Sequence, residues 1–291
     1  MNDTRISFFG LGLIGGSIAR AIRANYPKTH IQVYTRRKNP DLEKGMQEGV
    51  INSLHTDIDR SFCNCDILFL CAPVLTNMKV LQELKPLIDA NCIITDVGSV
   101  KGNIHREAAR LGMEQNFIGG HPMAGSEKTG YANSSEHLLR HCYYLLTPTN
   151  RTSEESLARL QAVLSCTESR FIVLDPQCHD AITAAISHVP HIVAAALVNM
   201  VRQNEDKQNY MKSFAAGGFK DITRIASSSP EMWESICLSN NESICTFLDQ
   251  MISGLTQIKQ NIAAEDSEQI RNFFKSASDY RNSIKDNMPS V

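Results

Sequence analysis

The sequence predicts an α/β protein in which a doubly wound sheet is followed by an all-helical domain. The first half of the chain alternates short apolar runs with segments of helical spacing, which is typical of βαβ units and a parallel sheet. After Asp175-Pro176 no further run resembles a strand, and long stretches of helical spacing follow. The length of 291 residues suits one large or two ordinary domains, at roughly 100–200 residues each.

The predicted elements of the first domain alternate along the chain. Apolar runs predict strands at residues 6–9, 31–35, 66–71, 92–96, 117–118, 143–146 and 171–174. Helical spacing of apolar residues predicts helices over 14–22, from an N-cap at Thr76 to 88, and from Ser153 to 164. We therefore expect residues 1–175 to form a parallel sheet with helices on both faces.

The second domain is predicted to span residues 176–291. Its helices are expected at about 177–202, 206–226, 230–262 and 266–285. The third helix has a clear start, with Ser229 at the N-cap and Pro230 at the first helical position, where a missing N–H costs nothing.

Composition excludes several classes of protein. With 31 acidic against 29 basic residues, the chain has no net field that would attract nucleic acid or an anionic membrane. The longest uncharged apolar run, residues 67–75, is far shorter than the ~20 residues of a membrane span. No signal peptide is visible, and the nine cysteines form no CxxC pair. We therefore expect a cytoplasmic protein that binds neither nucleic acid nor membrane.

A glycine-rich turn lies between the first predicted strand and the first helix. In Gly10-Leu11-Gly12-Leu13-Ile14-Gly15, the glycines permit a tight turn, close approach of a pyrophosphate, and close packing of helix on strand. The N–H groups at Leu13 and Ile14 would open a helix that binds phosphate. A plain structural turn is the alternative, but the position in the first βα unit favours a dinucleotide.

The residue that contacts the cofactor's ribose is expected about 20 positions further on, at the end of the second strand. Thr35 stands there, followed by Arg36 and Arg37, and no acid is present to bind a free 2′-hydroxyl. Two arginines suit a 2′-phosphate, because guanidinium groups bind phosphate through paired hydrogen bonds. NADP is therefore favoured and NAD remains possible; a solvated basic loop is the alternative.

A second group of motifs follows two later strands, at the sheet edge where ligands bind in such folds. Residues 96–101 read DVGSVK, and residues 119–127 read GGHPMAGSE. His121, held between glycines and a proline, can accept a proton near pH 7 as a neutral imidazole. The alternative is a histidine that only ties its loop together.

Polar residues also gather in the helical domain. Ser187, His188 and His191 fall within about one helical turn, and Arg224 lies in a segment, residues 217–226, that reads GGFKDITRIA. An arginine beside an apolar helix face can be a structural ion pair or a clamp for a carboxylate. The segment SPEMW, residues 229–233, follows.

Taken together, these motifs resemble the prephenate dehydrogenase family of tyrosine biosynthesis. The order and spacing of GLGLIGGS, DVGSVK, GGHPMAGSE, SHVPH, GGFKDITRIA and SPEMW carry the resemblance, from about residue 5 to about 285. It implies a Rossmann domain joined to a helical dimerisation domain, with the active site between them. It also implies oxidative decarboxylation of prephenate to 4-hydroxyphenylpyruvate and CO2, with a nicotinamide cofactor taking the hydride.

The resemblance also implies roles for individual residues. His121 would take the hydroxyl proton, and Ser99 would hydrogen-bond His121 or the same hydroxyl. Arg224 would bind a substrate carboxylate. Many family members carry an acid at the position of Thr35 and use NAD, so the family's cofactor preference does not transfer. Trp233 would lie near the site, either of its own chain or across a dimer interface. The remaining residues expected at the substrate pocket are Ser187, His191, Gly217 and Glu127, the last guarding the entrance.

Other functions were weighed against this one. Arogenate differs from prephenate only in its side chain; His191 favours the keto acid. A different hydroxyacid or imine dehydrogenase would share the glycine turn but not the later motifs. A nucleotide sensor would not need His121, Ser99 and Arg224 together. A metal hydrolase would have to use His179, Asp180, His188 and His191, whose spacing is poor for zinc, so no metal is predicted.

A homodimer is predicted through the helical domain. Its apolar helix faces exceed what about 115 residues can bury alone, and closed two-fold dimers are the commonest assembly. The faces include Ile192, Val193, Leu197, Ile236, Leu238, Phe247, Leu248, Ile252 and Leu255.

Overall fold

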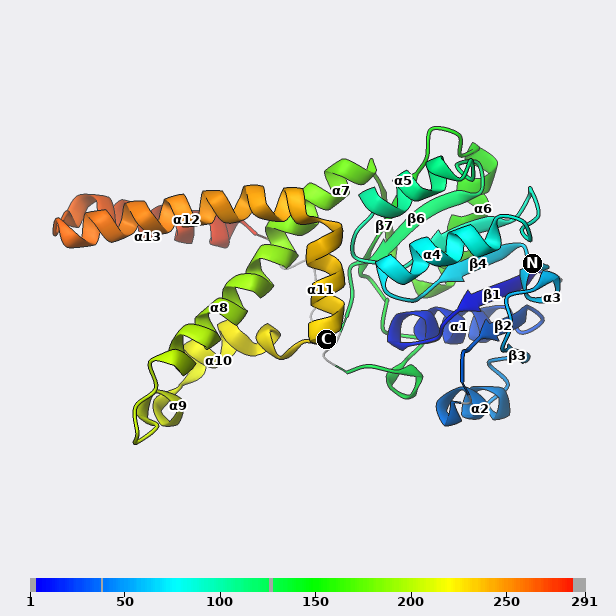
Figure 1. Cartoon of the computed structure of the whole chain (residues 1–291), viewed down its shortest axis with the longest axis horizontal. Helices are drawn as coiled ribbons and strands as arrows, with labels where there is room; N and C mark the ends of the chain where they lie inside the picture. The colour runs from blue at the N-terminus through cyan, green and yellow to red at the C-terminus, as the bar shows by residue number, and fades with distance from the viewer. Residues whose placement is uncertain (1–3, 38, 126–127, 285–291) are drawn as a thin grey trace.

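The computed structural model describes residues 4–37, 39–125 and 128–284. An eight-stranded sheet, with strand order β3-β2-β1-β4-β5-β6-β7-β8, forms one side of the molecule, and long helices project from it (Figure 1). The order of the first six strands is that of dinucleotide-binding sheets. The strands are β1 Arg5–Phe9, β2 His30–Tyr34, β3 Ser53–His55, β4 Ile67–Leu70, β5 Ile93–Asp96, β6 Phe117–Pro122, β7 Tyr143–Pro148 and β8 Arg170–Val173.

Helices cover both faces of the sheet, as predicted. One core lies under α1 (Leu13–Asn25) and α6 (Glu154–Leu164), and the other under α3 (Arg60–Cys63), α4 (Val74–Leu84) and α5 (Gly102–Arg110). Three short elements complete this part: α2 (Pro40–Gln47), η1 (Tyr131–Asn133) and η2 (Ser165–Thr167). The sequence analysis missed β3, α2, α3 and α5, which are short or follow polar segments.

Two local predictions are wrong. The sheet is not parallel throughout, because β7 runs antiparallel to β6. A parallel neighbour needs a long crossover, usually a helix, and the described residues between these strands form only the short η1. Thr76 is not an N-cap either: α4 begins at Val74, after Pro73, whose φ of −55° already suits a helix start.

The helical region is more broken than predicted. The expected helix over 177–202 contains a π-turn, and the expected helix over 230–262 breaks at Asn240. The start at Ser229-Pro230 is confirmed, since the Ser229 hydroxyl accepts a hydrogen bond from the N–H of Met232. The elements are α7 Pro176–Thr183, η3 Ala184–His188, α8 Val189–Gln203, α9 Tyr210–Phe214, α10 Gly217–Thr223, η4 Arg224–Ser227, α11 Pro230–Ser239, α12 Asn241–Ala263 and α13 Ser267–Ser283.

One helical stretch among the described residues, Pro176–Gln203, is long and apolar enough to cross a membrane by length and composition. Charged and polar residues interrupt this stretch, so it contains no long uncharged apolar run. Two of these residues, His179 and Asp180, are buried and hydrogen-bond to the α/β part of the chain. The stretch is therefore weak evidence of a membrane span.

Candidate active site

The glycine turn has the geometry expected of a phosphate-binding site. Gly10 follows β1 with φ +77°, a conformation that favours glycine, and Gly12 has open space beside its Cα. A Cβ on Gly15 would lie 2.8 Å from the sulfur of Cys71, so the third glycine lets α1 pack closely on the loop after β4. The first turn of α1 has neither a side-chain cap nor an acid. Its N–H groups are thus available to an anion.

The predicted ribose-binding loop lies beside this turn. The N–H of Gly10 donates to the carbonyl of Tyr34 at 3.3 Å, and Thr35 follows directly. The Thr35 hydroxyl donates to the carbonyl of Arg37 at 2.8 Å, which closes the loop. The side chains of Arg36 and Arg37 are exposed.

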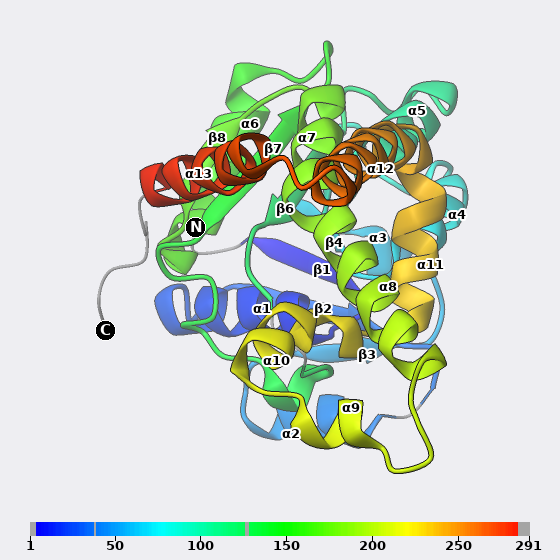
Figure 2. The ribbon, with the colours of Figure 1, turned by 90° about the vertical axis from the view of Figure 1, so that its left-hand side faces the viewer.

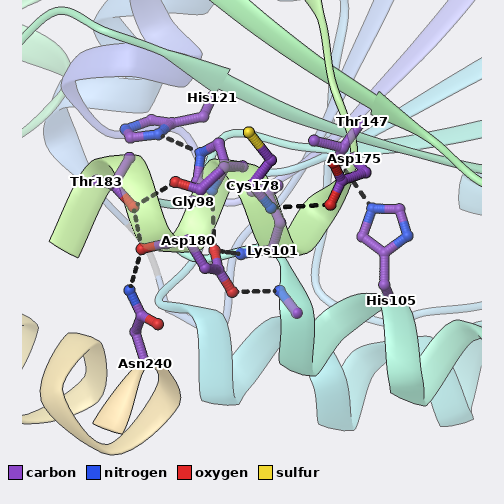
Figure 3. Close-up of polar contacts among 12 residues, drawn as sticks. Gly98, Lys101, His105, His121, Thr147, Asp175, Cys178, Asp180, Thr183 and Asn240 are labelled. Carbon is purple, nitrogen blue, oxygen red and sulfur yellow. Dashed lines mark hydrogen bonds and ion pairs between the residues drawn. The ribbon is translucent and has the colours of Figure 1, made fainter. Parts of the chain in front are cut away.

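A chain of hydrogen bonds connects His121 on β6 to the helical region. Nδ1 of His121 lies 2.9 Å from Nε2 of His179, and Nδ1 of His179 lies 2.8 Å from Oδ1 of Asp180 (Figure 3). The Asp180 carboxylate also accepts the N–H groups of Lys101 and Gly102, each at 2.7 Å. We call the three side chains of His121, His179 and Asp180 the relay.

The relay determines where the histidine protons reside. A carboxylate only accepts, so Nδ1 of His179 carries a hydrogen and donates it to Asp180. Nε2 of neutral His179 then accepts a hydrogen from Nδ1 of His121. Nε2 of neutral His121 is left with the lone pair, and it is therefore the atom that can take a proton from a substrate.

The surroundings keep these groups in the required protonation states. Burial raises the pKa of Asp180, but the hydrogen bonds from His179 and from the backbone of Lys101 and Gly102 outweigh it, so its pKa is lowered. Burial lowers the pKa of His121 well below its ordinary value, and His179, Lys101 and His188 lower it further. His121 is therefore a neutral base at physiological pH.

Ser99 lies between β5 and α5 and is partly buried. Its neighbour Val100 packs with Val74 and Ile236, with Trp233 beside them, which brings this loop against α11. The described residues include no hydrogen bond between Ser99 and His121. Of the two expected roles, contact with the substrate hydroxyl stays a prediction.

A second cluster forms where η3 meets α8. Pro190 cannot donate a backbone hydrogen bond, and the preceding turn is a π-turn, a feature often found at functional sites. Nδ1 of His191 donates to the carbonyl of Ser187 at 2.8 Å, which leaves its Nε2 able to accept. The rings of Trp233 and His191 are in contact, with centroids 4.1 Å apart and planes tilted by 30°, and the rings of Trp233 and His188 meet edge to face with centroids 6.0 Å apart.

Both parts of the chain are similar to known proteins. Residues 18–173 match the nucleotide-binding domain of prephenate dehydrogenase, and residues 175–276 match its dimerization domain. The chain belongs to the prephenate dehydrogenase family. It is 39% identical over 286 residues to prephenate dehydrogenase of Bacillus subtilis, covering 98% of this chain and 76% of that one.

Two solved structures of the family's fold are close to this one. The structure of prephenate dehydrogenase from Aquifex aeolicus, in complex with hydroxyphenyl propionate and NAD+, superposes with a TM-score of 0.90 at 30% identity, covering 97% of this chain and 98% of that one. Synechocystis arogenate dehydrogenase superposes with a TM-score of 0.82 at 29% identity, covering 96% and 99%. The predicted family, the fold class and the assignment to NAD(P)-dependent oxidoreductases are confirmed.

Two more of the residues predicted from the family resemblance, Gly217 and Arg224, lie in the helical region. Gly217 begins α10 and Arg224 begins η4; both residues are exposed, and both elements contact α8, which carries His191. Glu127 lies outside the described residues. Ile236, predicted in the dimer face, is instead buried against Val74 and Val100.

The relay was not predicted from the sequence. His179 and Asp180 were expected at most as metal ligands, yet His179 binds both Asp180 and His121. Among the described residues, no group of three His, Cys, Asp or Glu side chains is arranged to hold a metal ion. The available signal was a histidine and an acid in the first turns of a helix capped by Asp175.

Proposed function

We propose that this protein catalyses the oxidative decarboxylation of prephenate to 4-hydroxyphenylpyruvate and CO2 in tyrosine biosynthesis. The observation that carries the proposal is His121, a neutral base whose Nε2 is left unprotonated by the relay. It lies at the end of a strand in a dinucleotide-binding sheet, where ligands of such folds bind.

In this proposal, Nε2 of His121 takes the hydroxyl proton while the hydroxyl-bearing carbon is oxidised. Ser99 hydrogen-bonds the same hydroxyl. The bond to the ring carboxylate then breaks, its electron pair makes the ring aromatic, and CO2 leaves. The ring oxygen becomes a phenolate and takes the proton back from the His121 imidazolium. Proton, electron pair and leaving group are thus accounted for without a metal.

The cofactor fits the glycine turn described above, and when bound it accepts the hydride. Gly10, Gly12 and Gly15, with the N–H groups at Leu13 and Ile14, would hold its pyrophosphate. For its 2′-phosphate we propose the loop from Thr35 to Arg37, which gives a preference for NADP over NAD. The support is the absence of an acid in this loop and the exposure of both arginines beside Gly10.

The substrate would lie between the sheet edge and the helical region. We propose that Arg224 binds a carboxylate of prephenate. Trp233 and His191 would form one wall of the pocket, and the contact between their rings supports this. Ser187 and Gly217 would line it and Glu127 would guard its entrance. We propose prephenate rather than arogenate as the substrate, because prephenate dehydrogenase of Bacillus subtilis is 39% identical to this chain, and His191 would lie beside the side chain that distinguishes the two compounds.

We also propose a cytoplasmic homodimer built through residues 176–291, with residues 1–175 as the cofactor domain. The last strand ends at Val173 and α7 begins at Pro176, which supports this boundary. Viewed from the helical side, α8, α10, α12 and α13 face outward (Figure 2). No residue of α13 is buried. The exposed apolar side chains on these helices include Met200, Ile222, Ile252, Leu255, Ile262, Phe273 and Phe274.

Sedimentation at micromolar concentration tests the assembly. We expect a species of about twice the 32.3 kDa of one chain. A stable monomer would reject the dimer.

Initial rates with prephenate and with arogenate, each with NAD and with NADP, test the activity. The His121→Asn variant should lower kcat by roughly 100- to 10,000-fold, the usual range for a general base, with cofactor affinity unchanged. The exposed His137 provides the control variant His137→Asn, which should keep wild-type turnover. Near-normal turnover of His121→Asn would remove the base from its role, and turnover of arogenate alone would correct the substrate.

A further inference from the structure

Two opposite charges are buried beneath the candidate site, and no step proposed above uses them. The side chains of Lys101 and Asp96 are both 0% exposed, and they form an ion pair through Nζ and Oδ2. Neither can reach a substrate. A buried ion pair contributes little net stability, because desolvation offsets the attraction between the charges. We therefore look for its role in the backbone groups that it binds.

The ion pair binds the backbone of β6 just beyond the point where the pairing of β6 with β5 ends. Pairing between β5 and β6 stops at Thr95 and Ile118. Beyond that point, Oδ1 of Asp96 accepts the N–H of Gly120 at 3.1 Å, and Nζ of Lys101 donates to the carbonyl of Gly120 at 2.9 Å. Both backbone polar groups of the residue before His121 are thus bound by this ion pair.

The same ion pair holds the loop that carries Ser99. Oδ2 of Asp96 accepts the N–H of Gly98 at 3.0 Å. A Cβ on Gly98 would lie 2.9 Å from that oxygen, and a Cβ on Gly120 would lie 2.6 Å from the carbonyl oxygen of Asp96. The glycines of the two motifs are therefore what allows the backbone to approach the ion pair so closely.

Lys101 also reaches the relay. Its backbone N–H donates to Oδ1 of Asp180 at 2.7 Å, the oxygen that accepts from His179. One residue therefore connects three parts of the site, namely the Ser99 loop, the strand of His121 and the helix that carries Asp180.

We propose that the buried Lys101–Asp96 ion pair is a positioning device for the proposed dehydrogenase reaction, holding Ser99 and His121 in the geometry in which proton and hydride leave the same substrate. The inference rests on the proposed function. A displacement of about 1 Å in such a device can lower the rate roughly 100-fold without loss of any group that touches the substrate.

Because Lys101 is charged, its positioning role can also be tested through the pH dependence of kcat/KM. The titratable groups that act on His121 are His179 of α7, Lys101 before α5 and His188 of η3. Asp180 in turn binds His179, and Asp96 binds Lys101. Burial, His179 and Lys101 lower the pKa of His121. Removing the Lys101 ammonium should therefore raise that pKa and move the acidic limb of kcat/KM to higher pH.

The test compares Lys101→Met, the double variant Asp96→Asn/Lys101→Met, and the control Arg110→Met, which removes a cation from the far end of α5 that pairs only with Glu107 among the described residues. Circular dichroism and NADP+ titration establish folding, and the double variant leaves no unpaired buried charge if the single variant fails to fold. We expect kcat to fall roughly 100-fold in the Lys101 variants, with KM for prephenate within a few-fold. The acidic limb should move upward in Lys101→Met, and Arg110→Met should behave as wild type.

A folded Lys101 variant with wild-type kcat, or a slow Lys101→Met whose acidic limb is unmoved, overturns the positioning role while the proposed function stands. A wild-type protein that oxidises neither prephenate nor arogenate overturns both.

Discussion

Nδ1 of His121 lies 2.9 Å from Nε2 of His179, and this contact joins the sheet to the helical region. His121 is on β6, whereas His179 is on α7 and is fully buried. The proton position on the candidate base is therefore controlled from the other part of the chain. Any change that reorients α7 should alter the chemistry at His121 even if the cofactor domain is unchanged.

The first prediction concerns Asp180. In Asp180→Asn, the new amide can donate to Nδ1 of His179, which favours the opposite tautomer along the relay and places a hydrogen on Nε2 of His121. A carboxylate-to-amide change in the equivalent position of a Ser-His-Asp triad lowers kcat about 10,000-fold. We expect a loss of roughly 100- to 10,000-fold here, measured as kcat with prephenate at saturating cofactor.

Asp175→Asn is the matched control. It makes the same chemical change on the same helix, at the N-cap, where asparagine serves as well as aspartate. It should keep wild-type turnover. A folded Asp180→Asn with turnover within a few-fold of wild type would show that the relay does not control His121.

Local spacing was enough to predict the glycine turn and the candidate base. The roles of Gly10, Gly12 and Gly15 depend on only six consecutive residues, and His121 is marked by the glycines before it and the proline after it. The relay was not predictable in this way, because 58 residues separate His121 from His179. Two residues so far apart meet only through the packing of α7 against the sheet.

The direction of β7 and the buried ion pair were also not predicted, because both depend on residues outside the local sequence pattern. The apolar run at residues 143–146 predicts a strand, but its direction depends on the connection before it, which contains no α-helix pattern. Asp96 and Lys101 are charged residues in a segment that follows a strand, and such residues are usually found in exposed loops. Only the close approach of Gly98 and Gly120 makes room for these charges in the interior.

The second prediction concerns Arg224. If it pairs with a substrate carboxylate, Arg224→Ala should lose a charge-assisted contact of about 1.5–3 kcal/mol, which corresponds to a rise in KM for prephenate of roughly 10- to 150-fold. The matched control is Arg151→Ala, the same change at an exposed arginine in the α/β part of the chain, where Arg151 pairs with Glu114. An unchanged KM together with a large fall in Tm would show that Arg224 is structural.

The third prediction is a loss of stability in acid that depends on His105. Burial and the nearby charge of Lys101 lower the pKa of His105 to about 4, while its Nε2 lies 2.9 Å from the Thr147 hydroxyl. In the unfolded chain a histidine takes up its proton near pH 6.5. Between pH 6.5 and 4 the unfolded state therefore binds more protons, and the free energy of unfolding falls as the pH falls.

His105→Gln keeps a side chain able to bind Thr147 but cannot titrate. Urea unfolding at pH 7 and at pH 4.5 should show that this variant loses less stability than wild type, by up to about 3 kcal/mol at the acid end. His137→Gln, at an exposed position, is the control and should keep the wild-type dependence. If the free energy of unfolding falls equally with pH in His105→Gln and wild type, His105 is not the cause of the acid sensitivity.

The last prediction concerns the cofactor. Arg36 and Arg37 are exposed beside the glycine turn, and the loop contains no acid that would repel a 2′-phosphate. A charge-assisted pair to an exposed phosphate contributes at most about 1.5–3 kcal/mol, and salt screens part of it. The expected preference for NADP over NAD is therefore about ten- to hundredfold in kcat/KM.

Arg36→Ala should remove most of this preference while its NAD kinetics, the internal control, stay near wild type. Thr35→Asp should reverse the preference, because a carboxylate accepts from a free 2′-hydroxyl and repels a phosphate. A wild-type enzyme that uses NAD as well as NADP would show that both arginines point into solvent, and it would leave the dehydrogenase assignment intact.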